Sequence, residues 1–217
     1  MPPVRSAIKE EAMGLSADQL RLALDALSET EPKIAAAIRR VGYPEPRINE
    51  RGYATLLRTI IGQQVSVAAA RSVWAKLEAA LGALTDPATI AAASDETLRA
   101  AGMSRQKASY ARSLAEEVTS GRLDLMDLPL DDEEAIAKLV TVKGIGRWSA
   151  EIYLLFAEGR TDIWPAGDLA VQIEVGRILG HDARPSEKLT RELAEAWRPH
   201  RGAAAIFAWH HYGSATL

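Results

Sequence analysis

Apolar residues recur every three or four positions along most of this sequence, and that spacing restricts the chain to packed helices. One stretch places them at Tyr53, Leu56, Leu57, Ile60 and Ile61. This repeat is typical of an amphipathic helix with one buried face. Alternating runs of β-branched and aromatic residues, which mark strands, are missing. The fold class is therefore predicted to be all-α, with roughly ten short helices of ordinary length.

Local signals for the ends of helices agree with this periodicity. A side chain that can cap a helix precedes several apolar runs, and a glycine follows several others. The expected caps are Ser16, Asp86, Ser94 and Ser186, and the expected terminating glycines are Gly82, Gly102, Gly159 and Gly180.

The composition narrows the class of protein. A chain of 217 residues with 47% hydrophobic and 25% charged residues can bury a core as one domain or as two small interleaved ones. The absence of cysteine excludes disulfides, thiolate nucleophiles and cysteine-ligated metals, and the four histidines lack metal-ligand spacing. No cofactor is therefore expected to be required.

The termini and the net charge give two further expectations. The opening segment Met1–Glu11 is charged, and no apolar run is long enough for a signal peptide or a membrane span, so we expect a cytoplasmic protein, nucleoid-associated if bacterial. The net charge of −3 argues against nucleic-acid binding by bulk electrostatics. Any contact with nucleic acid must be local.

One glycine-containing turn could provide such a contact. The segment 139–150 reads as helix, hairpin and helix, with Gly144 and Gly146 in the turn. Glycines let the backbone turn sharply and approach another molecule, and the start of the next helix offers unpaired N–H groups that suit a phosphate. The alternative is an ordinary connection between two helices.

Asp168 follows Trp164, Pro165 and a glycine, and it precedes a helical run from Leu169 to Leu179. Aspartate at this place is typical of a helix N-cap. Taken alone, capping explains Asp168. A catalytic carboxylate at a helix N-terminus is the alternative.

Taken together, these motifs resemble the helix-hairpin-helix (HhH-GPD) superfamily of base-excision DNA glycosylases, and most closely its DNA-3-methyladenine glycosylase II branch. The matching pieces occur in order from about residue 50 to the end of the chain. They are the segments 60–68, 102–107, 139–150, 164–168 and 197–201, followed by Trp209.

The resemblance implies two helical subdomains with a DNA-binding active-site cleft between them. The first is a six-helix subdomain, residues 49–161, which contains the helix-hairpin-helix. The second combines residues 1–48 and 162–217. The implied partner is double-stranded DNA that contains damaged bases, bound by a monomer.

The resemblance also implies roles for single residues. Asp168 matches the catalytic aspartate, and Trp148 takes the place at which bifunctional members carry a Schiff-base lysine. Gln64 matches the wedge that fills the gap left by the extruded nucleotide. The expected base pocket contains Gln63, Trp148, Ile152 and Trp209.

Contacts to the DNA backbone are implied for Lys143, Gly144, Ile145, Gly146, Arg147 and Ser149. The carbonyls of Val140, Val142 and Ile145 match those that hold a monovalent cation, Na⁺ or K⁺, at the hairpin. Arg105, Lys107 and Arg112 share one predicted helix and could meet phosphates or form a solvated face.

The function that the resemblance implies is a monofunctional glycosylase that excises alkylated bases of the 3-methyladenine type by base flipping and hydrolysis, without AP lyase activity. A nearby carboxylate suits this reaction because the sugar becomes positively charged as the glycosidic bond breaks. One alternative is a glycosylase for uracil, a mismatch or an oxidised base. The other is a non-catalytic helix-hairpin-helix DNA-binding module.

Overall fold

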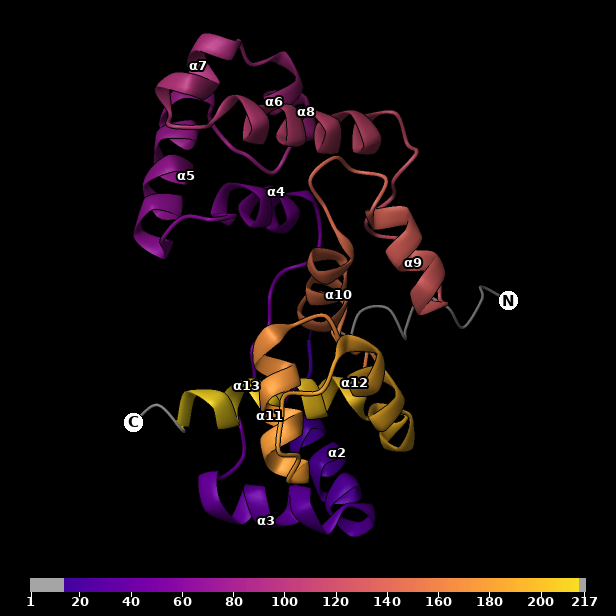
Figure 1. The fold of residues 1–217 in the computed structure, drawn as a ribbon. Coiled ribbons are helices and arrows are strands. Elements are labelled where there is room, and N and C mark those ends of the chain that lie inside the picture. The colour runs from indigo at the N-terminus through magenta and orange to yellow at the C-terminus, as the bar shows by residue number, and fades with distance from the viewer. Residues whose placement is uncertain (1–13, 215–217) are drawn as a thin grey trace, which may run out of the picture. The chain divides into compact units, whose positions relative to one another are not determined.

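The computed structural model describes residues 14–214, which form twelve α-helices and one 3₁₀ helix without any strand (Figure 1). The predicted all-α class is confirmed. No helix within that span is long and apolar enough to cross a membrane. The opening segment Met1–Glu11, on which the expectation of no signal peptide depends, lies outside the described residues.

The chain divides into two compact units. One consists of residues up to Asn49 together with those from Leu154 onward, and the other of Glu50–Tyr153. The chain passes from one unit to the other twice, and the second passage falls within helix α10, Arg147–Phe156. The sequence analysis expected the first subdomain to span residues 49–161. These limits stay a prediction.

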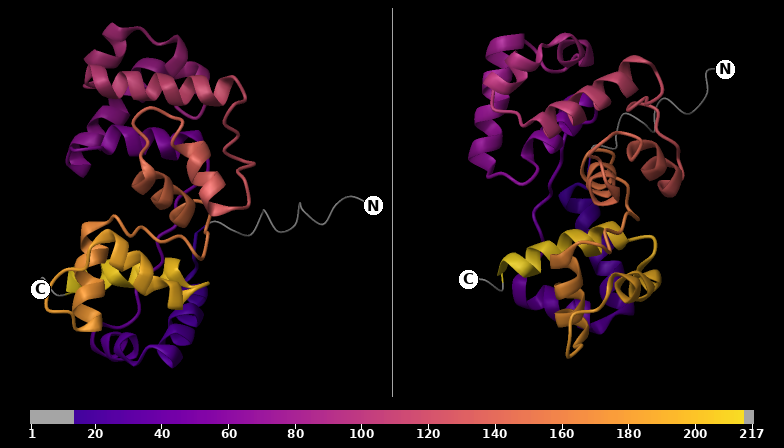
Figure 2. Two further views of the ribbon diagram at one scale, coloured as in Figure 1. Left: turned by 45° about the vertical axis from the view of Figure 1, so that its right-hand side comes forward. Right: turned by 45° about the horizontal axis from the view of Figure 1, so that its top comes forward.

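The continuous unit, Glu50–Tyr153, is built around helix α8. In Figure 2 this long helix runs beside α4 and α6, and both pack against it. The fully buried side chains include Leu56, Leu57, Ile90 and Leu114. The helices are α4 (Tyr53–Gly62), α5 (Val67–Leu81), α6 (Pro87–Ala92), α7 (Asp95–Ala100), α8 (Arg105–Thr119), α9 (Asp132–Leu139) and most of α10.

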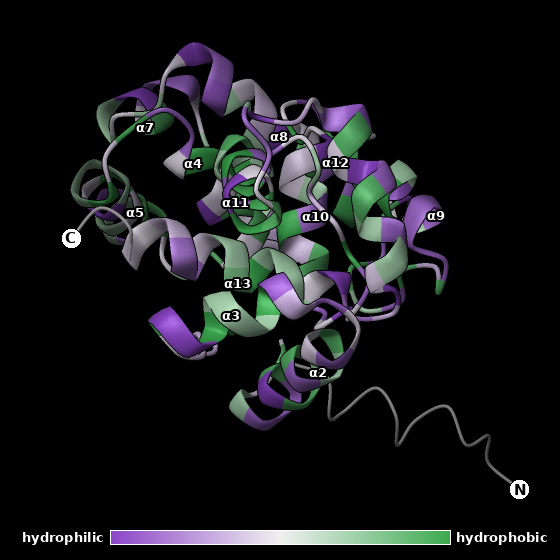
Figure 3. Cartoon of the chain, turned by 60° about the horizontal axis from the view of Figure 1, so that its bottom comes forward, coloured by the Kyte–Doolittle hydropathy of each residue, from purple (hydrophilic) through white to green (hydrophobic). Residues whose placement is uncertain are grey.

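The discontinuous unit joins both ends of the chain. Its N-terminal helices α2 and α3 pack against each other, α11 packs against α13 and α3, and α13 also packs against α2. In Figure 3 these helices carry green hydrophobic and purple hydrophilic stretches side by side, as expected for amphipathic helices. The elements are α2 (Ala17–Thr30), α3 (Pro32–Val41), α11 (Leu169–Leu179), α12 (Glu187–Leu193), the 3₁₀ helix η1 (Ala194–Trp197) and α13 (Arg201–Ser214).

The caps read from the sequence are present. Ser16 and Gln19 form a reciprocal capping box at α2, and Asp86, Ser94 and Ser186 each accept a backbone N–H at the start of their helices. These bonds satisfy donors that a helix leaves unpaired at its first turn. The predicted helix starts are therefore confirmed.

Candidate active site

The predicted hairpin is a tight turn between α9 and α10. Val142 and Ile145 are buried beneath it, and the backbone N–H of Ile145 donates to the carbonyl of Val142 at 3.0 Å. Gly144 has a φ of +83°, and a Cβ at this position would lie 2.1 Å from the ring of Tyr110 on α8. Only glycine fits, because both the backbone conformation and the close approach exclude a side chain.

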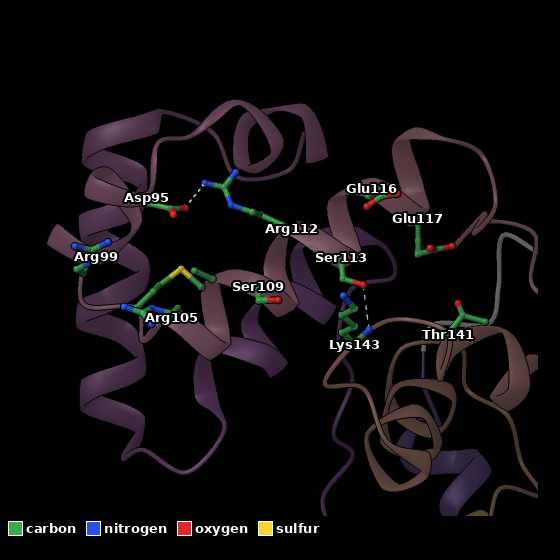
Figure 4. Close-up of a pocket in the computed structure, with 12 residues that line it drawn as sticks. Asp95, Arg99, Arg105, Ser109, Arg112, Ser113, Glu116, Glu117, Thr141 and Lys143 are labelled. Carbon is green, nitrogen blue, oxygen red and sulfur yellow. Dashed lines mark hydrogen bonds and ion pairs between the residues drawn. The ribbon is translucent and has the colours of Figure 1, made fainter.

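The hairpin presents backbone donors and one cation. Within residues 14–214 the N–H groups of Gly144 and Gly146 have no hydrogen-bond acceptor. Such groups at a helix N-terminus attract anions. The backbone N–H of Lys143 donates to Ser113 Oγ at 3.1 Å, as Figure 4 shows. The exposed Lys143 also lines a cavity of about 550 Å³ along α8.

Of the other expected contacts to the DNA backbone, Arg147 is exposed but paired with carboxylates, and Ser149 is buried. The Arg147 guanidinium donates to Glu133 at 2.8 Å and to Glu151 at 2.9 Å, and the bond to Glu133 chiefly raises the pKa of Arg147. The contacts of Arg147 and Ser149 with DNA stay predictions, and the structure shows that Arg147 would have to share its charge with two carboxylates.

Lys107 and Arg112 are turned toward their own unit. Lys107 Nζ donates to the Ile61 carbonyl at 2.7 Å, and burial lowers the pKa of Lys107. Arg112 donates to the Ala93 carbonyl at 2.7 Å and forms an ion pair with Asp95 at 2.8 Å. Both cations therefore hold α8 against its neighbours and leave less charge for phosphates.

The expected wedge lies in the turn between α4 and α5, residues 63–66, called here the wedge turn. Gln64 is exposed and has a φ of +54°, the left-handed region that residues other than glycine seldom adopt. Its neighbour Val65 is also exposed. Gln63, expected in the base pocket, donates from Nε2 to the Gly144 carbonyl at 2.8 Å. Backbone strain of this kind is characteristic of functional sites.

Asp168 lies at the start of α11, and its side chain is half-buried. Its Oδ1 accepts the backbone N–H of Val171 at 3.0 Å and the indole Nε1–H of Trp209 at 3.2 Å. The capping role read from the sequence is therefore present. The second donor, from α13, orients the same carboxylate and has no role in capping.

Trp209 belongs to an aromatic cluster in the discontinuous unit. Its ring lies 5.7 Å from that of Phe156, at an interplanar angle of 35°. The Arg47 guanidinium lies 4.9 Å from the centroid of the Phe156 ring, within the range of a cation–π contact. The cluster fixes the position of the Trp209 indole that donates to Asp168.

Helix α10 carries the other expected pocket residues on one face. Trp148 is 48% exposed, and Ile152, one turn later, is half-buried. The adjacent Tyr153 faces elsewhere: it is buried, and its hydroxyl accepts the N–H of Gly52 at 2.8 Å. Their membership of a base pocket stays a prediction.

The hairpin carbonyls suit the expected monovalent cation. Val140 is the C-cap of α9, Val142 and Ile145 lie in the turn that follows it, and the Val142 carbonyl accepts the N–H of Ile145. Carbonyl oxygens are ligands that hard cations prefer, and the monovalent cation at these residues stays a prediction.

Comparison with known proteins identifies the family. Residues 57–199, which include the wedge turn, the hairpin and Asp168, match the model of the HhH-GPD superfamily base excision DNA repair proteins. The chain belongs to the HhH-GPD superfamily.

Individual HhH-GPD proteins match over most of the chain. YfjP of Bacillus subtilis is 28% identical over 165 residues, which cover 72% of this chain and 58% of YfjP, so the chain spans less than two thirds of that relative. The solved structure of a DNA-3-methyladenine glycosidase from Bacillus halodurans is 30% identical and covers 89% of this chain and 90% of its own, with a TM-score of 0.81.

A third HhH-GPD relative was solved together with DNA. This 3-methyladenine DNA glycosylase of Schizosaccharomyces pombe, in complex with abasic DNA, is 28% identical and has a TM-score of 0.72. The match covers 90% of this chain and 97% of the other. The expected resemblance to 3-methyladenine glycosylases is confirmed by these matches.

Sequence reasoning missed three features of the HhH-GPD site. Phe156 lies one turn beyond Ile152 on α10, a spacing that could have indicated it. Arg47 and the bond from Trp209 to Asp168 had no signal, because their partners lie 109 and 41 residues away in the sequence (156 − 47 and 209 − 168).

Proposed function

We propose that this HhH-GPD protein is a monofunctional glycosylase that excises alkylated bases of the 3-methyladenine type from double-stranded DNA. Asp168 is the catalytic carboxylate. The observation that carries the proposal is the pair of donors on Asp168 Oδ1, one from the α11 backbone and one from Trp209. A carboxylate fixed in this way can face a developing positive charge without reorganising.

The chemistry needs little more than this charge. As the glycosidic bond breaks, the sugar takes on oxocarbenium character, which the Asp168 carboxylate stabilises while water attacks. An N-alkylated purine already carries positive charge and leaves readily, so strong acid catalysis is not needed. Trp148 and Trp209 are the aromatic residues proposed to select the base, because cation–π attraction contributes about 0.5–2 kcal/mol and stacking on an aromatic ring about 1–3 kcal/mol per base.

The hairpin is the proposed contact to the DNA backbone. The N–H groups of Gly144 and Gly146 would bind a phosphate, with Lys143 beside them. A Na⁺ or K⁺ ion held by the carbonyls of Val140, Val142 and Ile145 would add positive charge where the phosphate binds. The proposed DNA-binding form is a monomer.

The decisive experiment separates catalysis from capping at Asp168. Asp168→Asn keeps a good N-cap, because asparagine and aspartate are similar there, but it removes the negative charge. Single-turnover release of bases from methylated duplex DNA should fall about 10²- to 10³-fold, the usual loss for one preorganised electrostatic contact. DNA affinity and the melting temperature should stay close to wild type. An Asn variant with wild-type excision rates would leave Asp168 as a cap only.

Duplexes with single defined lesions test the specificity. Release of uracil, mismatched or oxidised bases in preference to alkylated purines would contradict the proposed substrate class. A chain that binds DNA but releases no base from any of these duplexes would be a non-catalytic DNA-binding module.

The absence of a lyase step has its own test. Trp148 takes the place of the Schiff-base lysine, so the expected product is abasic DNA with an intact strand at neutral pH. Borohydride added during turnover should trap no covalent protein–DNA complex. Trapping at the level of a true lyase would show that an amine acts as a nucleophile. Lys143 would be the first candidate, tested with Lys143→Gln.

A further inference from the structure

Gln63 links two segments that are 81 residues apart in the sequence. Its half-buried side chain donates from Nε2 to the Gly144 carbonyl at 2.8 Å. The same peptide unit is held at its other end, because the N–H of Ile145 donates to the Val142 carbonyl at 3.0 Å. Gln63 therefore fixes the orientation of the hairpin peptide that follows the unpaired N–H of Gly144.

The wedge turn is held from α8 as well. Lys107 Nζ donates to the Ile61 carbonyl in the last turn of α4, where a cation also complements the helix dipole. Gln64, two residues after the helix ends, has the unusual φ of +54°. A strained conformation persists only where the surrounding contacts maintain it. The bonds of Lys107 to Ile61 and of Gln63 to Gly144 hold the backbone on the N-terminal side of Gln64.

The hairpin packs against helix α8 as well. The Tyr110 ring packs against Gly144 so closely that no Cβ would fit, and the Tyr110 hydroxyl accepts from Gln106 Nε2 at 2.5 Å. A cavity of about 380 Å³ lies between these groups, lined by residues of the wedge turn, of α8 and of the hairpin. Within this cavity's lining Gln63 forms the direct side-chain bond between the wedge turn and the hairpin.

We propose that Gln63 is a positioning residue, which couples insertion of the Gln64 wedge to phosphate binding at the hairpin. This inference rests on the proposed function and deepens it. When the bond from Gln63 to Gly144 is intact, the wedge turn already has its binding conformation when the hairpin binds a phosphate. Without the link, the hairpin still binds phosphate, but the wedge turn relaxes from its strained conformation and fills the gap in the stack less well.

Two substitutions break the link in different ways. Gln63→Met keeps the length of the side chain and removes the donor, whereas Gln63→Glu keeps its shape and replaces the donor by an acceptor facing a carbonyl. Gln106→Met is the matched control, since it removes a glutamine bond in the same cavity lining that does not join the two segments. All three are made in the Asp168→Asn background, so that no base is released during the measurement.

The readout is a duplex with 2-aminopurine beside a tetrahydrofuran abasic analogue. Its fluorescence reports how the neighbouring base is stacked when the wedge fills the gap. We expect Gln63→Met and Gln63→Glu to weaken the fluorescent complex about fivefold, the effect of one net hydrogen bond. Affinity for undamaged duplex should change less than twofold, and Gln106→Met should match the parent protein.

A double-mutant cycle with Gln64→Ala decides whether Gln63 acts through the wedge. In the Gln64→Ala background, Gln63→Met should cause no further loss. Additive losses would overturn the proposal, as would an unchanged fluorescent complex in both Gln63 variants. Faster hydrogen exchange at the Ile145 amide in Gln63→Met is expected without DNA, and unchanged exchange would also contradict the link. Base release by the wild-type chain is measured separately. If the chain is not a glycosylase, that assay shows it, whereas the fluorescence and hydrogen-exchange measurements test only the role of Gln63.

Discussion

At the level of single residues, one oxygen of the Asp168 carboxylate combines the observed helix cap with the chemical role that we propose for it. The bond from Val171 N–H would form at any capped helix start, whereas the bond from Trp209 ties the carboxylate to an aromatic cluster. A hydrogen bond to a charged group contributes about 1.5–3 kcal/mol, so the indole is a substantial part of what holds Asp168.

Replacing this indole tests its contribution. Trp209→Phe keeps an aromatic ring beside Phe156 but removes the donor to Asp168. Base release from methylated duplex DNA should fall about tenfold. A tenfold change corresponds to about 1.4 kcal/mol, close to the lower limit for a hydrogen bond to a charged group. The measurement is the single-turnover rate at saturating enzyme.

Trp164→Phe provides the matched control. It also removes an indole donor in the same unit, but that donor bonds to the Thr190 carbonyl at 3.1 Å and not to Asp168. This variant should lose stability and keep its excision rate per folded molecule. Equal rate losses in both variants would mean that the Trp209 bond has no special role in orienting the carboxylate.

The sequence predicted single residues where the cause was local. Asp168 as an N-cap and Gly144 as a turn residue follow from their neighbours, and both are present. The strained φ of Gln64 and the partner of the Gln63 amide could not be predicted, because each depends on a contact made by a distant segment.

At the level of helices, the contact of α11 with α13 contains a buried charge. Glu174 on α11 is completely buried and contacts His211 of α13, which is buried as well. Arg177 Nη1 donates to Glu174 at 2.6 Å, and Arg40 of α3 contacts the other side of the His211 ring. Three helices of the discontinuous unit are thus joined by one polar network.

Removing the charge of Glu174 should cost considerable stability. Glu174→Gln leaves polar partners that an amide cannot fully satisfy, and breaking one side of a buried charged network costs about 3 kcal/mol. Urea unfolding should show this loss as a lower midpoint. Glu192→Gln is the control, because Glu192 is 61% exposed and lies 3.9 Å from Lys188, so its loss should be at most about 0.5 kcal/mol. A midpoint for Glu174→Gln equal to that of Glu192→Gln would contradict the network.

Helix ends and apolar faces were predictable from the sequence, and this network was not. The apolar pattern of α4 and the caps of α2, α6, α7 and α12 depend on residues within one or two turns. Glu174 lies within an apolar run, where a charged residue would ordinarily mark the exposed face. Its burial depends on His211, 37 residues away, and no local signal indicates that pairing.

At the level of the whole molecule, the net charge bears on the proposed DNA binding, and the path of the chain bears on what the sequence could predict. The net charge is −3, and the chain passes from one unit to the other at 49/50 and again within α10. The all-α class and the order of the motifs followed from the sequence. The second crossing had no sequence signal, because α10 continues through it without a break in its helical pattern.

The charge distribution predicts a shallow salt dependence of DNA binding. Log affinity falls with log salt concentration by about 0.9 for each phosphate that a cation neutralises, and a heavily charged binder reaches a slope of about −10. Here Arg147 is paired with Glu133 and Glu151, and Lys107 donates to a carbonyl of its own unit. The hairpin instead offers backbone N–H groups, which add no formal charge.

Affinity for a duplex with an abasic analogue, measured across a salt series, should therefore give a slope much smaller in magnitude than about 10. Lys143→Gln should reduce its magnitude by about 1, as expected for the loss of one phosphate contact. Lys188→Gln is the control, because Lys188 is exposed on α12, in the unit that does not contain the hairpin, and should leave the slope unchanged. A slope near −10 would show that many more side-chain cations reach the phosphates, and equal slopes for wild type and Lys143→Gln would remove Lys143 from the DNA contact.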